Sequence, residues 1–486
     1  MSWIGCSTCC ARTSPNSANR TAASATRKHS RISRRTDPVS RQGRHGQGFF
    51  YGWIVSGGAT LSYFFTNGVA YYLPQNLFPR LIEEFGLTVS QVSLAGALTF
   101  MVGGLSAPLA GLLIDRYGAV KVLRCGILVL AITATLYPFT ASLWQLYLLH
   151  MLFGVTMVSA GLMINVVLLS NWFNVKRGMV IGVLVAGSSL AGFILPNLIS
   201  GLVASPDYGW RWGFGVAAAL IWLLPVPAVW LFVREKPADV GQFPDGLAEP
   251  PRGHEDPAAL PGVTLREAMR TQTLWALALG SFCLWFSITA VNSQLTLFLE
   301  QEAGLAIRQA TLFYSLVLGF SVAGKFLFGW LADHRSKQEV MIIASLVLLA
   351  GCLLLFQVPG GTLMLTDSVA QLALFTLVYG LGFGGAFTMI QLVCIASFGQ
   401  RELGRILGLI IFIDTIGAVL GIAGIGMLRD LTGDYLLPFL IVAAVALVGA
   451  VNMWFVRPLD FAAAVETASP PLPGTTAPSS GTAPRH

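Results

Sequence analysis

The chain has 486 residues, of which 55% are hydrophobic and only 11% are charged, and its mean hydropathy is +0.69. The core of a soluble domain cannot bury so much apolar surface, so the composition excludes an ordinary water-soluble protein. The net charge of +7 does not indicate nucleic-acid binding, because many basic residues lie near the N-terminus, where they suit membrane orientation and contact with anionic lipid.

Residues 1–48 are rich in Arg, Ser and Thr and contain no apolar run, so they lack the pattern of a secretory signal. We expect a disordered, basic, cytoplasmic tail. Cys6, Cys9 and Cys10 cluster there without a histidine at ligand spacing. A disordered tail is therefore favoured over a metal or lipidation site.

Apolar blocks of about 20 residues, the length that crosses a bilayer as helix, follow one another along the rest of the chain. They predict an all-α membrane protein. The first block is the most polar, with Tyr63, Asn67 and Tyr71, which indicates that it faces an aqueous cavity. The twelve expected helices are 51–74, 90–114, 120–140, 144–170, 177–203, 211–233, 273–299, 308–332, 338–358, 368–397, 404–428 and 435–456.

The basic residues predict the orientation of these helices. The joints on one side hold only Arg80, Arg211, Arg308 and Arg429, whereas the joints on the other side and the two tails hold the remaining basic residues outside the helices. By the positive-inside rule, both termini are cytoplasmic in a multi-pass protein of the cytoplasmic membrane. His150, near the outer end of the fourth helix, is expected at the membrane interface.

The polar stretch 234–270 predicts a cytoplasmic linker between two six-helix bundles, at 49–233 and 271–457, and the Pro-, Thr- and Ser-rich residues 458–486 predict a disordered C-terminal tail. The second bundle repeats features of the first. Gly111-Leu-Leu-Ile-Asp115 recurs as Gly329-Trp-Leu-Ala-Asp333, and Asn165 in the fourth helix matches Gln391 in the tenth. Paired halves around a central site are a common architecture of secondary transporters.

At these positions the chain resembles the major facilitator superfamily. The loop GLLIDRYG (111–118) is similar to the signature between that family's second and third helices, and 329–335 is similar to its degenerate second copy. The resemblance implies the twelve-helix fold and a cytoplasmic gating latch, in which Asp115 caps a helix N-terminus or pairs with a neighbour. A merely solvated turn is the alternative. The latch residues are Gly111, Asp115, Arg116, Gly118, Gly329, Asp333 and Arg335.

Further details resemble the monocarboxylate transporter and oxalate/formate antiporter branch of the superfamily. These are WF followed by KRG at 172–178, REKP at 234–237, PDG at 244–246, and FG at 398–399 followed by Arg405 and Gly408. The branch carries a basic residue four positions before a glycine in helix eight, which is implied to hold a substrate carboxylate. Lys325, four positions before Gly329, matches it.

At three positions the sequence differs from the pattern of that branch, and these differences restrict the class of substrate that the resemblance implies. Lysine replaces the usual arginine at 325, so the planar, bidentate grip on a carboxylate is lost. Gln75 stands where animal-type members have a lysine, and Asp414 is the ionisable residue of helix eleven, where oxalate-type members add a lysine. A monoanion is therefore favoured over a dianion.

Inserting a lysine or an aspartate at the centre of a membrane-spanning helix costs about 2.5 to 3.5 kcal/mol. Lys325 and Asp414 are therefore expected to have compensating interactions or a function. We expect Lys325 to attract the substrate anion and Asp414 to pair with it when the site is empty, or to take the proton that accompanies the anion. The alternative is that Lys325 snorkels to the inner surface and a Ser or Thr hydroxyl caps Asp414. Other cavity candidates are Tyr63, Asn67, Asn165, Trp285, Asn292 and Gln391.

The prediction is a secondary transporter that moves a small organic anion, with a monocarboxylate favoured, by proton symport or anion exchange. We expect no cofactor and no metal, no nucleic-acid partner, and a monomer in the lipid bilayer. An exporter of amphipathic compounds or drugs is the alternative, and it is less favoured because the fifth helix lacks the Gly-Pro pair of drug exporters. A non-transporting membrane sensor and a membrane-embedded enzyme are disfavoured, because no signalling domain and no catalytic constellation is visible.

Overall fold

The computed structural model describes residues 49–247, 262–358, 363–399 and 401–457. The two expected tails, with Cys6, Cys9 and Cys10, lie outside the described residues, as does the middle of the expected linker.

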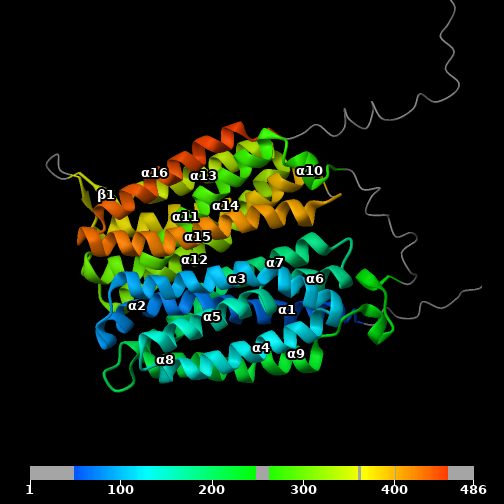
Figure 1. Cartoon of the computed structure of the whole chain (residues 1–486), viewed down its shortest axis with the longest axis horizontal. Coiled ribbons are helices and arrows are strands. Elements are labelled where there is room, and N and C mark those ends of the chain that lie inside the picture. Colours follow the sequence, from blue (N-terminus) through cyan, green and yellow to red (C-terminus); the bar gives the residue numbers. More distant parts are fainter. Residues whose placement is uncertain (1–48, 248–261, 359–362, 400, 458–486) are drawn as a thin grey trace, which may run out of the picture. The chain divides into compact units, whose positions relative to one another are not determined.

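The first six membrane crossings are coloured blue to green in Figure 1. The first crossing combines two α-helices around a π-helical turn, and the third, fourth and sixth also contain two helical pieces each. Their bounds are α1 (Gly52–Asn67), η1 (Gly68–Tyr72), α2 (Leu73–Phe85), α3 (Val89–Tyr117), α4 (Ala119–Leu136), η2 (Tyr137–Phe139), α5 (Leu143–Ser159), α6 (Leu162–Trp172), α7 (Arg177–Val203), α8 (Gly209–Leu223) and α9 (Pro225–Phe232).

The second six crossings are coloured green to red in Figure 1. Short turns and a short helix belonging to the linker precede them, and a two-stranded antiparallel hairpin interrupts them. The bounds are η3 (Pro237–Val240), η4 (Pro244–Gly246), α10 (Leu265–Ala268), α11 (Gln272–Gln301), α12 (Ile307–His334), α13 (Lys337–Leu353), β1 (Phe356–Gln357), β2 (Met364–Leu365), α14 (Val369–Phe398), α15 (Leu403–Thr432), α16 (Leu436–Asn452) and η7 (Met453–Phe455).

All twelve expected helices are present, and ten segments of the described chain are long and apolar enough to cross a membrane. The other two crossings are the composite first one and α13, which has 17 residues. Large apolar side chains such as Leu105, Trp144 and Leu431 remain exposed on the helices, as expected for surfaces that contact lipid.

Two predicted helix ends are wrong. The first crossing does not end at 74 but continues to Phe85, because the π-turn Gly68–Tyr72 carries the chain past Pro74, which sits in the first turn of α2. The ninth helix does not reach 358 but ends at Leu353, because Phe356–Gln357 pairs with Met364–Leu365 as a hairpin.

The first described part of the linker, 234–247, is ordered against the N-terminal half. The Glu235 carboxylate accepts hydrogen bonds from the backbone N–H groups of Ala119 and Val120, at 2.9 and 2.8 Å, and so caps the start of α4. The Asp245 carboxylate accepts from the N–H groups of 174–176, just before α7. Carboxylates at helix N-termini satisfy unpaired donors and favour the helix dipole. The linker therefore anchors two helices.

The polar contacts between the two six-helix halves lie toward one end of the helices. We call the end that carries Gly118, Lys176 and Asp245 the linker end, and the end with Gly86 and Gly433 the opposite end. Among the described residues, hydrogen bonds and ion pairs that cross between the halves run from Lys325 to the opposite end, and none lies nearer the linker end.

Candidate functional site

Lys325 lies on α12 of the C-terminal half, and its side chain crosses to α7 of the N-terminal half. Its Nζ atom donates to the backbone carbonyl of Val185 at 3.0 Å and to Ser189 Oγ at 2.7 Å, and the residue is only 8% exposed. Ser321, one turn earlier on α12, donates to the same Ser189 Oγ at 2.8 Å. The snorkelling alternative is therefore wrong: the amino group is buried between the halves, held by neutral acceptors.

Tyr63 and Asn67 of α1 lie beside this contact. Asn67 Nδ2 donates to the Tyr63 hydroxyl at 3.2 Å and also to Ser188 Oγ, the neighbour of Ser189 on α7. The two residues are one helical turn apart, so they share a face of α1. The structure thus joins Tyr63, Asn67 and Lys325, which the sequence marked separately, through the pair Ser188 and Ser189.

Aromatic rings form another wall of the Lys325 surroundings. The Lys325 Nζ atom lies 4.8 Å from the ring centroid of Phe387 on α14, which is cation–π geometry. Phe387 in turn packs edge-on against the predicted cavity residue Trp285 of α11, with centroids 5.8 Å apart. Trp285 therefore belongs to the same group of residues, although it does not touch the amino group through a hydrogen bond.

Asp414 of α15 is equally buried, at 5% exposed, but it has a different partner. Its Oδ1 atom accepts a hydrogen bond from Ser281 Oγ of α11 at 2.6 Å, and among the described residues no ion pair joins it to Lys325. The expected pairing of the two charges is therefore wrong for this conformation. Each group has a hydroxyl of its own, as the alternative interpretation expected for Asp414.

Asn165 and Gln391, which occupy equivalent positions in the two halves, have different surroundings. Asn165 Nδ2 donates to the carbonyls of Ala160 and Gly161, at 2.9 and 2.7 Å, where α5 breaks before α6. Ser62 and Thr66 also donate to the Ala160 carbonyl. Asn165 thus satisfies backbone groups freed by a helix break, whereas Gln391 lies half-buried in the unbroken helix α14.

Asn292 of α11 forms part of a second polar cluster, with Tyr71 and Gln75 of the first crossing. The Tyr71 hydroxyl lies beside both amides. All three side chains are buried, yet neither amide nor the hydroxyl meets hydrogen-bond geometry within the described structure. Together these three side chains make a polar patch where α11 meets the first crossing.

The sequence missed six residues of the site, namely Val185, Ser188, Ser189, Ser281, Ser321 and Phe387. Ser188 and Ser189 are two small hydroxyl residues in an apolar helix, a signal that was present but that is also common in helix packing. Val185 contributes only a carbonyl, and Phe387 is one of many aromatic residues. No sequence pattern distinguishes either of them.

The predicted latch is not engaged. Asp115, Arg116, Asp333 and Arg335 are exposed, and no ion pair or hydrogen bond from Asp115 or Asp333 occurs within the described ranges. Gly118 has a φ of +88°, a conformation that favours glycine, and Glu235 packs against it. Asp115 was expected to cap a helix or pair with a neighbour. Instead, Glu235 of the linker caps the helix that follows Gly118.

His150 was expected at the membrane interface, and that prediction is wrong. The side chain is 1% exposed, and its Nδ1 and Nε2 atoms lie 2.9 Å from Thr99 Oγ1 and 3.2 Å from the Tyr137 hydroxyl. It packs inside the N-terminal half because hydroxyls from α3 and η2 satisfy both ring nitrogens. No group of three His, Cys, Asp or Glu side chains that could hold a metal gathers in the described part of the chain.

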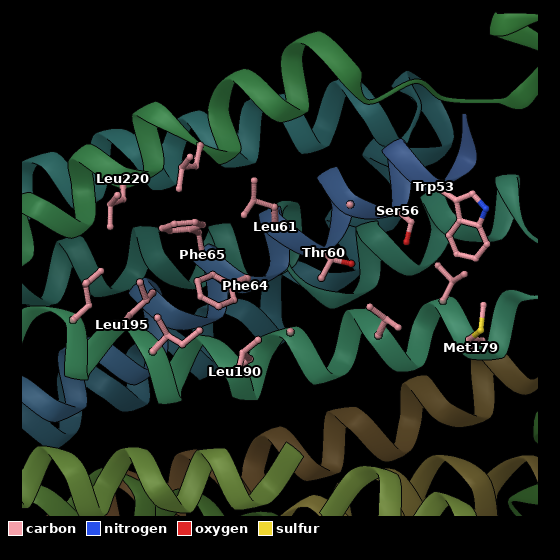
Figure 2. Close-up of a pocket in the computed structure, with 17 residues that line it drawn as sticks. Trp53, Ser56, Thr60, Leu61, Phe64, Phe65, Met179, Leu190, Leu195 and Leu220 are labelled. Atoms are coloured by element: carbon pink, nitrogen blue, oxygen red, sulfur yellow. The ribbon is translucent and has the colours of Figure 1, made fainter. Parts of the chain in front are cut away.

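A separate cavity of about 650 Å³ lies on the N-terminal half (Figure 2). It is lined by α1, α7 and α8, and its wall is apolar apart from the Ser56 and Thr60 hydroxyls and the Trp53 indole. Neither Lys325 nor any other predicted substrate-binding residue lines it. We call it the α1–α7 groove.

Comparison with known proteins agrees with this architecture. Human monocarboxylate transporter 11 is 25% identical to the chain over 82% of each protein. The probable sulfoacetate transporter SauU of Cupriavidus necator is 27% identical, over 78% of the chain and 88% of its own length. The structure of a bacterial homologue of the human lysosomal transporter Spinster has the same fold, with a TM-score of 0.61 and 17% identity over 84% of the chain and 95% of its own length.

The family model of the Major Facilitator Superfamily matches residues 56–422, a range that runs from α1 through the linker into α15 and ends before the last crossing, α16. The twelve crossings, the signature loop before Gly118 and the buried lysine between the halves agree with that match. The chain belongs to the Major Facilitator Superfamily, which is a family of membrane transporters and not of enzymes.

Proposed function

We propose that the protein is a secondary transporter of a small organic anion, with a monocarboxylate as the favoured substrate, and that Lys325 binds the carboxylate. The observation that carries this proposal is the buried Lys325 Nζ atom between the halves, whose hydrogen bonds go to a carbonyl and a hydroxyl. No carboxylate side chain neutralises it within the described structure.

The energetics favour an anion at this position. A lone positive charge at mid-membrane costs about 2.5 to 3.5 kcal/mol, and neutral dipoles offset only part of that cost. A substrate carboxylate would supply a full negative charge and a charge-assisted hydrogen bond, which is roughly twice as strong as a neutral one. The Ser189 hydroxyl and the Val185 carbonyl would then act as placeholders that the substrate displaces.

The remaining residues set the expected size and charge of the substrate. Tyr63, Asn67, Ser188 and Ser321 supply neutral donors and acceptors around a single amino group. One cation favours one carboxylate. Relatives named for monocarboxylate and sulfoacetate transport support an organic anion as the class of substrate.

Transport then follows from the position of the contact. Lys325 and Ser321 belong to the C-terminal half and Ser189 to the N-terminal half, so binding takes place where the halves meet. Alternating access requires the polar contacts at the opposite end to open while the linker end closes, around a site that stays central. The latch residues Asp115 and Asp333, exposed here, would engage in that second state.

The test is uptake of labelled monocarboxylates by proteoliposomes. Lys325→Gln should abolish uptake, because glutamine keeps a polar side chain, one bond shorter than that of lysine, but removes the charge. Lys325→Arg should keep part of it. Lys121→Gln, at an exposed lysine of the linker end, is the matched control and should transport normally.

Uptake by Lys325→Gln at the wild-type rate would refute the proposal. Thermal stabilisation by a carboxylate without any flux would instead identify a sensor, and efflux of dyes without carboxylate uptake would identify an exporter of amphipathic compounds. Proton symport and anion exchange are separated by imposing a pH gradient or an internal counter-anion.

A further inference from the structure

The α1–α7 groove opens beside cationic and aromatic side chains at the linker end. Figure 2 shows Trp53 and Met179 at one end of the groove and Phe65, Leu195 and Leu220 toward the other. The Nζ atom of Lys176 lies 5.5 Å from the ring centroid of Trp53. Arg177, the first residue of α7, is exposed next to it. The groove therefore has an apolar floor and a basic rim.

The length of the groove matches the hydrocarbon core of a bilayer. From Met179 to Leu198 the groove follows α7 for 20 residues, which rise by about 28 Å, close to the roughly 30 Å thickness of the hydrocarbon core. The half nearest the linker end is long enough for one acyl chain that enters at Trp53. Tryptophan and lysine side chains favour the headgroup level of a membrane, which places Trp53 and Lys176 where a lipid phosphate lies.

The walls of the groove are apolar and leave open space beside Gly57. Gly57 and Gly187 are among the lining residues, and a Cβ atom added at Gly57 would meet no other atom within 4 Å. Val183 and Leu190 of α7 line the groove and are exposed at 49% and 41%. Ser56, one turn from Trp53 on α1, offers a hydroxyl at the depth where the ester carbonyls of a lipid follow its phosphate.

We propose that the α1–α7 groove is a binding site for an anionic phospholipid, with one acyl chain in the groove and the phosphate held by Lys176 and Arg177. Charge complementarity at the rim selects an acidic headgroup over a zwitterionic one. Each basic residue near a membrane surface contributes about 1 kcal/mol to attraction of acidic lipid, which corresponds to roughly a fivefold preference. This site is independent of Lys325 and of the substrate.

Native mass spectrometry of the full chain tests the proposal. The purified protein is equilibrated with mixed micelles that contain equal amounts of phosphatidylglycerol and phosphatidylcholine. We expect one retained phosphatidylglycerol per chain, in preference to phosphatidylcholine. The double variant Lys176→Gln/Arg177→Gln should lose that preference by roughly tenfold or more, whereas the matched Lys121→Gln/Arg335→Gln, at exposed cations outside the groove lining, should keep it.

A second pair of variants tests the groove itself. Gly57→Leu fills the groove from α1, and Gly424→Leu makes the same change at an exposed glycine of α15 whose Cβ also meets nothing within 4 Å. Gly57→Leu should reduce retention of both lipids, and Gly424→Leu should not. Equal retention of the two lipids by the wild-type protein would overturn the proposal, as would the same lipid retention in Gly57→Leu and Gly424→Leu.

Discussion

Two buried ionisable side chains characterise the protein at the scale of single residues. Lys325 and Asp414 lie in helices of the same half, and each is satisfied by a hydroxyl, from Ser189 and Ser281 respectively. Because they are not paired, the substrate does not have to break an ion pair before it reaches Lys325. Asp414 is then free to serve a different purpose, such as carrying a proton.

Replacing Asp414 tests that purpose. Asp414→Asn keeps the shape and the hydrogen bond with Ser281 but cannot titrate, so uptake driven by a pH gradient should fall at least tenfold while exchange of internal for external anion persists. Parallel measurements of gradient-driven uptake and counterflow in proteoliposomes would show the split.

Ser281→Ala is the matched control, because it removes the hydroxyl partner and leaves the carboxyl group. It should retain coupling to the pH gradient. If Asp414→Asn accumulates substrate in response to the gradient as the wild-type protein does, Asp414 is not the proton carrier.

At the scale of elements, the linker stabilises the helices of the N-terminal half. In the sequence, Glu235 and Asp245 stood out only as members of the motifs REKP and PDG. In the structure, the Glu235 carboxylate accepts hydrogen bonds from the first N–H groups of α4, and the Asp245 carboxylate accepts them from the backbone just before α7. Both α4 and α7 begin without a side-chain cap from their own N-cap residues, Gly118 and Lys176. The linker therefore supplies the capping carboxylates that the N-cap residues of these two helices lack.

Removal of either carboxylate should therefore destabilise the protein. Glu235→Ala and Asp245→Ala should each cost about 1 kcal/mol, the usual contribution of a helix cap, and should lower the thermal midpoint in detergent. Asp333→Ala changes an exposed aspartate at the same end, without a hydrogen-bond partner in the described structure, and should leave the midpoint unchanged. Equal midpoints for all three variants would contradict the capping role.

At the scale of the whole molecule, the halves are joined at the opposite end. The Asp430 carboxylate on α15 accepts hydrogen bonds from the backbone N–H groups of Val89 and Ser90, at 3.2 and 2.7 Å, and so caps α3 across the two halves. At the same end of the molecule, Arg80 of α2 forms an ion pair with Glu300 of α11. These contacts must break before this end can open.

Asp430→Ala should therefore favour opening of the opposite end. A hydrogen bond to a charged group contributes about 1.5 kcal/mol or more, so the open population should rise roughly tenfold. The readout is the rate of maleimide labelling of Ser93→Cys in a background without native cysteines, because Ser93 is fully buried against Gln294 of the other half.

Asp434→Ala is the control at the same end, since the Asp434 carboxylate accepts from the Leu436 N–H within its own half. It should not change the labelling rate. Labelling that is equally fast in Asp430→Ala and Asp434→Ala would show that the cap across the halves does not hold this end closed.

The sequence by itself determined the class of the protein, its crossings and the candidate lysine. Hydrophobicity over about 20 residues is a local property, because every residue in a lipid-facing span must satisfy its backbone within its own helix. For the same reason the two wrong helix ends lie where other interactions act: the π-turn that passes Pro74 and the hairpin that ends α13 at Leu353. Lys325 was also recognisable from the sequence, because it is a charged residue within an apolar segment.

Only the tertiary structure decided which polar groups meet. Lys325 and Asp414 lie at similar depths along their helices, yet depth leaves the rotation of each helix and its choice of neighbour open, and the partners proved to be Ser189 and Ser281. Asn165 and Gln391 occupy equivalent positions in the repeat, but only Asn165 adjoins a helix break. Contacts between helices depend on packing across hundreds of residues, which local sequence patterns do not encode.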